Sequence, residues 1–322
     1  MAFCFKRKES VPKAIRRLGR ERVEDALECL KNCPQAEAIH CARKDIKKVR
    51  AVLRLVRKEI ERKEVRLTTK LLRRAAKLLA APRDAHVKMK TLANLRRHFK
   101  GQLAPSALRY IRGELRDAFD KEMQRFAKEK AAKTVRRLLC RVAKKLPCLK
   151  VRGKGWKLLG PGVKTAYADG ISAYQIARKD SCPENFHEWR KRAKELWYQV
   201  TLLRRVWPEQ MDAMAEELEM LGEHLGEDHD LVMLGQSIQE VSAGKHHPRE
   251  LETLKGLIEE RQRELRAAAL AVGAHFYAEK PSAFCRRLAG YWKIWSRENK
   301  RSAPACPGNS ITFVEAFVRP EI

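Results

Sequence analysis

The chain has 322 residues, which is enough to bury a large apolar core, and it carries a formal net charge of +30 with a pI near 10.1. Such a charge favours a polyanionic partner: nucleic acid, anionic lipid, acidic protein or polyphosphate. No segment is apolar enough for a signal peptide or a membrane span, so we expect a cytoplasmic protein with no membrane partner.

The positive charge is concentrated in the first half of the chain. Residues 1–150 hold 44 Lys and Arg against 16 Asp and Glu, whereas residues 151–322 hold 26 against 24. We therefore expect the first half to dominate capture of a polyanion. Nine cysteines are scattered singly, and the Cys29–Cys33 pair has no second pair nearby. This spacing does not predict a zinc site, and we predict neither a metal nor a cofactor.

Almost every segment has apolar residues spaced three and four apart, as in amphipathic helices, and none alternates with a period of two. We therefore expect an all-α fold. Pro82 is predicted to end the third helix and Asp84 to cap the fourth. The stretch 147–162 is rich in glycine and proline and is predicted to separate two halves. In the first half we predict helices over residues 11–30, 38–60, 65–80, 84–98 and 106–146.

The predicted helix over residues 38–60 carries two parallel stripes. Its apolar residues predict a seam that is buried against partner helices. One position further along lies a row of basic residues, where a solvated helix usually mixes its charges. Like charges three or four residues apart repel by roughly 0.2–0.5 kcal/mol per pair, so the row indicates a bound anion. The row comprises His40, Arg43, Lys47, Arg50, Arg54 and Arg57.

The pattern of the first half begins again after residue 160. The motif His-x-x-Arg-Lys-x-x-Lys that starts at His40 recurs at His187, with a similar apolar seam. Asp84 follows the first motif histidine by 44 positions, and Asp230 follows the second by 43. Each aspartate is predicted to cap a helix, and it could also hold a neighbouring arginine. This internal duplication predicts two pseudo-symmetric helical-bundle repeats of four to five helices each, over residues 8–150 and 160–300, and a flexible tail over 303–322.

In the second half we predict an opening helix, a helix with the second histidine motif, and an acidic helix over residues 209–225. The stretch Gly226-Glu227-Asp228-His229-Asp230 is predicted to lie at a break before the next helix, and a last long helix spans 248–299. Where the first basic row has Arg50 and Arg54, the second half has Trp197 and Thr201, and cations resume at Arg204. The outer surface of the second half is therefore a poorer binding face.

The two histidine motifs, each followed by an Arg-Asp or His-Asp sequence, resemble the conserved histidine α-helical domain (CHAD) family over residues 8–298. The resemblance implies two halves around a basic central groove lined by the two histidine helices. It also implies binding of inorganic polyphosphate without catalysis, and association with polyphosphate granules. Carried over by position, the ligand-facing residues are His40, Arg43, Lys44, Lys47, Arg50, His187, Arg190, Lys191 and Lys194.

Further basic residues extend this predicted binding set. They belong to the end of the first basic row, to one face of the third helix, to the first helix and to the end of the second histidine helix. They are Arg54, Arg57, Arg66, Lys70, Arg73, Arg16, Arg20 and Arg204.

The chemistry of these residues suits a linear chain of phosphates. Arg donates forked hydrogen bonds to phosphate oxygens, and Lys supplies a compact mobile charge. No aromatic residue is interleaved in the first basic row to stack bases, which argues against single-stranded nucleic acid. Duplex nucleic acid and general polyanion binding stay open as alternatives. The histidines are expected to stay neutral because the neighbouring cations oppose protonation.

A metal-dependent phosphohydrolase is the alternative from another class of function. The sequences Asp228-His229-Asp230 and Arg83-Asp84-Ala85-His86 are superficially similar to the His-Asp metal pair of such enzymes. That chemistry requires several further His and Asp ligands around one ion. The sequence does not offer them at a helical spacing that would bring them together, so we predict a protein that is not an enzyme.

Overall fold

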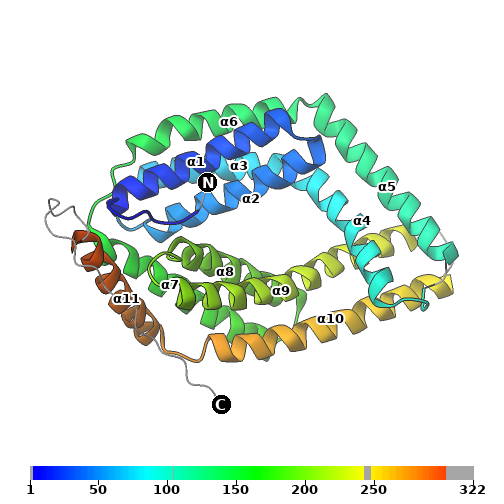
Figure 1. Cartoon of the computed structure of the whole chain (residues 1–322). Helices are drawn as coiled ribbons and strands as arrows, with labels where there is room; N and C mark the ends of the chain where they lie inside the picture. Colours follow the sequence, from blue (N-terminus) through cyan, green and yellow to red (C-terminus); the bar gives the residue numbers. More distant parts are fainter. Residues whose placement is uncertain (1–2, 104, 243–247, 302–322) are drawn as a thin grey trace, which may run out of the picture.

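A computed structural model describes residues 3–103, 105–242 and 248–301 (Figure 1). Within these ranges the protein has eleven α-helices, a single short 3₁₀ turn and no β-strand. The one β-type pairing in these ranges is an isolated antiparallel bridge between Ile60 and Val151. The predicted all-α class is therefore confirmed. None of the helices in the described ranges is long and apolar enough to cross a membrane. The predicted tail over 303–322 lies outside the described residues.

Six helices precede residue 150 and five follow it. The first six are α1 (Val11–Asn32), α2 (Gln35–Leu55), α3 (Arg62–Leu78), α4 (Ala80–His98), α5 (Pro105–Lys128) and α6 (Ala131–Lys145), and the 3₁₀ turn spans Leu146–Cys148. The last five are α7 (Gly155–Lys179), α8 (Pro183–Leu202), α9 (Pro208–Ser242), α10 (Pro248–Phe276) and α11 (Pro281–Arg301).

Several predicted helix boundaries are wrong. The expected long helix over 106–146 is two helices, because Lys130 adopts a left-handed conformation with φ of 49° between α5 and α6. The long helix over 248–299 is likewise divided into α10 and α11. α4 already begins at Ala80, so Pro82 lies in its first turn and Asp84 is not a cap. α9 runs without interruption through residues 226–230, where we predicted a break, and α7 already begins at Gly155, inside the predicted boundary.

A large apolar core passes through both halves of the molecule. In the first half, α1 packs along α2, and α6 covers α1 and α3 from the outside (Figure 1). In the second half, α8 packs between α7 and α9, and α11 packs on α7. The largest fully buried side chains in this core are aromatic: Trp189, Tyr167, Phe186 and Phe284 of the second half, and Phe5 of the first. Burial of such side chains is the main source of stability for the fold.

A second, separate apolar core lies at the other end of the molecule. It joins Leu92 and Leu95 of α4, Phe99 just after that helix, and two residues of α5 to leucines and isoleucines of α9 and α10. Figure 1 shows α4 and α5 descending from the first half to reach α9 and α10. The two halves therefore touch at both ends of the molecule. At one end the basic helix α2 contacts α7 and α8, and at the other end α4 and α5 contact α9.

The backbones of the two halves approach each other closely at the end of α2. The carbonyl oxygen of Leu55 lies 1.9 Å from the point where a Cβ atom on Gly162 of α7 would stand. Only glycine leaves room for the backbone of α2 at this crossing. The position of α7 against α2, and with it the position of α8 beside α2, depends on this missing side chain.

We predict that Gly162→Ala destabilises the protein by about 2–3 kcal/mol, because the added methyl group forces the two helix backbones apart. The melting temperature should fall by roughly 5–10 °C in a thermal unfolding experiment. Gly235→Ala in α9 is the matched control, because a Cβ atom there meets no atom within 4 Å. The control should be neutral or stabilise by up to about 1 kcal/mol. Equal melting temperatures for the two variants would contradict the proposed contact.

Candidate anion-binding site

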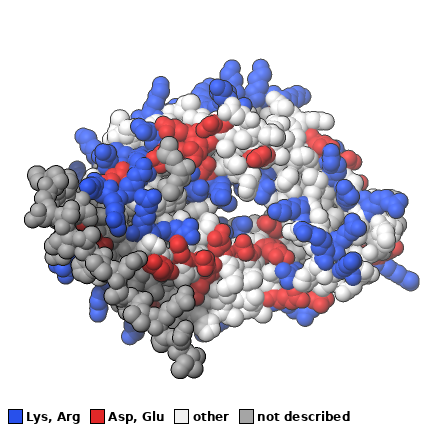
Figure 2. All heavy atoms as spheres, in the orientation of Figure 1, with Lys and Arg blue, Asp and Glu red and all other residues white. Residues whose placement is uncertain are grey.

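Four helices border a hollow in the face of the molecule that Figure 2 shows. In Figure 1, α2 and α4 lie on one side of it, and α8 and α9 lie on the other. Lys and Arg side chains gather above the hollow and at its right-hand end, while Asp and Glu follow its lower edge. The hollow is thus bordered by both predicted histidine helices and by the two helices that carry the Arg-Asp and His-Asp sequences.

The basic row of α2 lies directly beside the buried seam. Ile39, Ile46 and Val49 are at most 1% exposed, so the neighbouring positions on the helix are fixed at the edge of the core. Arg43 and Arg50 are half-buried, whereas Lys47 is accessible to water. Core packing therefore fixes the direction in which this basic row points.

Lys47 lies where cations from three helices meet. Burial, followed by the charges of Arg190, Arg43, Lys194 and Arg83, lowers the pKa of Lys47 to about 8. A lysine that water reaches and that is nevertheless surrounded by protein is expected at the floor of a hollow. The neighbouring positive charges come from α2, α4 and α8, so the basic side chains of the two halves do face one another.

Arg190 and Lys194 of α8 lie across two glycines of α9. A Cβ atom on Gly222 would stand 2.7 Å from Cε of Lys194, and one on Gly226 would stand 3.6 Å from Nε of Arg190. The ammonium group of Lys194 also lies 4.6 Å from the ring centroid of Trp197. The side chain of Lys194 therefore occupies the space that a Cβ atom on Gly222 would fill, whereas Arg190 lies at an ordinary van der Waals distance from Gly226.

Two carboxylates stand among these cations. Oδ1 of Asp84 in α4 lies 3.8 Å from Nη2 of Arg43, and Nη1 of Arg43 donates a hydrogen bond of 3.2 Å to the carbonyl of Ala76. Burial raises the pKa of Asp84, and the attraction of Arg43 only partly opposes this rise. Asp84 therefore holds an arginine, as the sequence suggested, from the second turn of its helix and not from a cap.

Asp230 of α9 is the second carboxylate among these cations. Burial raises the pKa of Asp230, while Arg190, Arg83 and Lys47 act in the opposite direction. The charge of Asp84 raises it further, so the two carboxylates are close enough to repel. Arg83 interacts with both aspartates, and burial still lowers the pKa of its guanidinium group.

Two histidines stack beside these charges. The ring centroids of His187 in α8 and His229 in α9 are 4.0 Å apart. Burial, followed by the charges of His187 and Arg190, lowers the pKa of His229 to about 4. Burial also lowers the pKa of His187, whose Nδ1 is buried without a hydrogen-bond partner among the described residues. Burial and the charge of Arg83 lower the pKa of His40, so all three imidazoles are neutral at pH 7, as the sequence predicted.

We refer to these converging residues of α2, α4, α8 and α9 as the central cluster. It contains five cations, two carboxylates and two neutral histidines, so its formal charge is positive without a ligand. Such a cluster can bind an anion that carries several charges over a short length. Its members are Arg43, Lys47, Arg83, Asp84, His187, Arg190, Lys194, His229 and Asp230.

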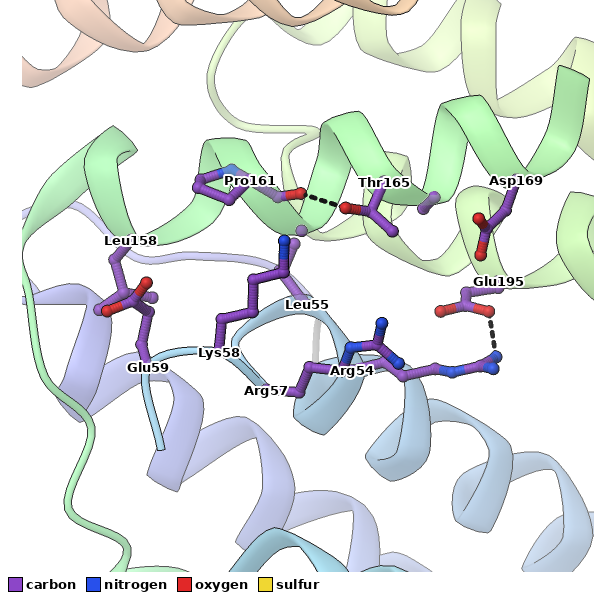
Figure 3. A pocket seen from close by; sticks show the side chains of 12 residues that line it. Arg54, Leu55, Arg57, Lys58, Glu59, Leu158, Pro161, Thr165, Asp169 and Glu195 are labelled. Carbon is purple, nitrogen blue, oxygen red and sulfur yellow. Dashed lines mark hydrogen bonds and ion pairs between the residues drawn. The ribbon is translucent and has the colours of Figure 1, made fainter. Parts of the chain in front are cut away.

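The predicted basic row is divided at the end of α2. Arg54 forms an ion pair with Glu195 of α8, beside a small pocket where α2 meets α7 (Figure 3). α2 ends at Leu55, so Arg57 lies beyond the helix, in the lining of the same pocket. Burial, followed by the charges of Arg73 and Arg54, lowers the pKa of Arg50. Arg50 is thus the last residue of the basic row of α2 that extends the central cluster, and Arg54 and Arg57 lie apart from it.

The remaining predicted residues lie in different surroundings. Lys44 is exposed on α2, and its charge helps to lower the pKa of Lys194. The predicted residues of α3 form an exposed basic face. Four others have partners outside the central cluster. Arg16 donates to the carbonyl of Leu149, and Arg20, Lys191 and Arg204 form ion pairs with Glu24, Glu188 and Asp212. The exposed residues of α3 are Arg66, Lys70 and Arg73.

Three participants were missed by sequence reasoning. Arg83 and His229 lay in sequences that we had noticed, but these were interpreted as helix starts or as fragments of a metal site. For Asp230 the cap was wrong, whereas the interaction with neighbouring arginines was expected. Glu195, the partner of Arg54, gave no signal in the sequence. Within the described residues, no group of three or more His, Cys, Asp or Glu side chains is arranged to hold a metal ion.

Comparison with known proteins identifies the fold. The family model described as "CHAD domain" matches residues 14–239. The chain is similar to the crystal structure of the CHAD domain from the plant Ricinus communis, with a TM-score of 0.57 and 17% identity, over 86% of this chain and 95% of that one. It is also similar to PptA from Streptomyces chartreusis, with a TM-score of 0.63 and 13% identity, over 84% of this chain and all of that one. No curated protein sequence matches significantly.

We predict that the ligand-free protein loses stability as the pH falls from 7 to 5.5, in part through His229. Its pKa is about 4 in the folded protein and 6.5 ordinarily, so the unfolded chain binds a proton first. The contribution is at most about 1 kcal/mol at pH 5.5, reduced by solvent screening of the half-buried ring. Urea unfolding at both pH values should show a smaller loss in His229→Gln than in the wild type.

His275→Gln, a change of an exposed histidine in α10, is the control for this experiment. It should retain the pH dependence of the wild type. An unchanged pH dependence in His229→Gln would show that His229 titrates normally in the folded protein.

Proposed function

This chain belongs to the CHAD domain family, and we propose that it binds inorganic polyphosphate in a basic groove between α2, α4, α8 and α9, without altering the ligand chemically. The observation that carries the proposal is the environment of Lys47. Arg43, Arg83, Arg190 and Lys194 all act on this one ammonium group, and the pKa of Lys47 falls to about 8. A chain of phosphates would relieve this repulsion, because its successive negative charges can neutralise several of these cations at once.

The proposed binding set follows the geometry of the central cluster. Its innermost members are Arg43, Lys47, Arg190 and Lys194, with His40 and His187 as neutral hydrogen-bonding groups. Lys44, Arg50 and Lys191 extend it along α2 and α8. Arg83 joins the set because it lies among the same cations. The exposed face of α3 would continue the path outside the groove.

Polyphosphate suits this site better than nucleic acid. A single-stranded site usually offers free aromatic faces on which bases stack. Trp197 is an aromatic residue beside the cluster, and the ammonium group of Lys194 lies over its ring. Duplex DNA needs mainly phosphate contacts, so a general polyanion binder is the alternative that an experiment must separate.

We further propose that the site arose from the two repeats predicted at residues 8–150 and 160–300. In this arrangement α8 corresponds to α2, and Asp230 corresponds to Asp84. Each repeat would supply one histidine helix and one aspartate helix to a shared site. We place the protein in the cytoplasm, at polyphosphate granules where these occur.

The first prediction is selectivity for polyphosphate over other polyanions. Calorimetric titration near physiological salt should give tight binding of long-chain polyphosphate and much weaker binding of duplex DNA with matched charge. The affinity should fall steeply with added salt, because binding releases counterions. Similar affinities for the two ligands would show that the protein binds polyanions in general. Release of phosphate from polyphosphate with added Mg²⁺ or Mn²⁺ would show that the protein is an enzyme.

The second prediction concerns where the ligand binds. Replacing Arg43, Lys47 and Arg190 together by Gln should weaken polyphosphate binding at least roughly 30-fold, because several charged hydrogen bonds are lost. The matched control replaces Lys133, Arg136 and Arg137, three exposed cations of α6 on the outer side of the first half. This control removes the same charge and should change the affinity less than about threefold. Equal losses would mean that net charge, and not a site, governs binding.

A further inference from the structure

We propose that Asp84 and Asp230 are built-in competitors of the anionic ligand, which set how densely charged an anion must be in order to bind. The inference rests on the proposed binding of polyphosphate in the central cluster. It assigns to the two carboxylates a role opposite to that of the cations around them: each weakens the binding of every anion that enters.

The first step is the position of the carboxylates. Oδ1 of Asp84 lies 3.8 Å from Nη2 of Arg43, and Asp230 is close enough to Arg190, Arg83 and Lys47 for their charges to oppose the rise of its pKa. These cations are the ones that would contact the ligand. A phosphate bound between α2 and α8 would therefore share its cations with two negative charges already present, and it would be repelled by both.

The second step is the loose geometry of this pairing. The Arg43–Asp84 separation of 3.8 Å is too long for a hydrogen bond. By contrast, Arg17 pairs with Glu9 through donors at 2.8 and 2.9 Å, which is the geometry of a structural ion pair. Burial also raises the pKa of both aspartates despite the cations nearby. The side chain of Asp84 is 46% exposed, so water can solvate this carboxylate when a ligand takes its cation. A ligand with more charge can take over their cations at low cost.

The third step is the consequence for selectivity. Orthophosphate brings little more charge to the cluster than the aspartates already supply, so it gains little by entering. A polyphosphate chain places charge on every phosphate, and it can neutralise the cations of α2 and α8 together. The two carboxylates thus weaken the binding of every anion, so that a short anion falls below a useful affinity while a long, densely charged chain still binds.

The test compares Asp84→Asn and Asp230→Asn, measured separately by calorimetry with long-chain polyphosphate and with tripolyphosphate. Each variant should bind both ligands roughly 5–10-fold more tightly than the wild type, because one facing negative charge is removed. The control is Asp120→Asn on α5, which makes the same change in net charge at a residue paired with Arg116. It should change the affinity less than twofold.

The opposite sign would overturn the inference. If the aspartates hold Arg43 and Arg83 in the orientation that binds the ligand, both variants will bind polyphosphate more weakly than the wild type. An equal gain in Asp120→Asn would also overturn it, because long-range charge alone would then explain the effect. If one variant fails to fold, the other decides the result, since the two residues lie on different helices. A wild-type protein that binds no polyphosphate would overturn the proposed function itself.

Discussion

The repulsion between the basic side chains of α2 and α8 is the constraint on which the rest of the structure depends. Arg43 and Lys47 on one helix face Arg190 and Lys194 on the other. Each positive charge raises the electrostatic free energy of the others. Nothing within the cluster stabilises this arrangement fully. The apolar cores therefore have to hold the two basic helices together against this repulsion.

Two separate cores share that task. One extends along α1, α2, α7 and α8 and brings the backbones of α2 and α7 together at Gly162. The other joins α4 and α5 to α9 and α10 at the opposite end. Because the halves are fastened at both ends, the charges between them cannot relax by moving apart. A site with an excess of positive charge therefore persists without a ligand, which is the preorganisation that strong anion binding requires.

The sequence could predict the helices that carry the site, but not how they meet. The spacing of Ile39, Ile46 and Val49 predicted the buried seam of α2, and the basic row followed from it. By contrast, Lys130 interrupts a helix with neither glycine nor proline beside it, so local rules give no warning of the break. Gly226 was interpreted as a break, whereas it lies inside α9, where its helix packs against Arg190 of α8. The contacts of Arg83 and Asp230 depend on which helices become neighbours, which is a tertiary property that periodicity does not encode.

The strong charge of the first half and the central cluster serve different physical purposes. Residues 1–150 carry a net charge of +28, and many of these cations lie on the outer helices α3, α5 and α6, in contact with solvent. Such charges attract a polyanion from a distance and are screened by salt within about 10 Å at 0.1 M ionic strength. The central cluster instead takes cations almost equally from both halves and surrounds them with protein, where screening is weaker. Excess charge therefore explains attraction, whereas selectivity must come from the few residues that the two halves bring together.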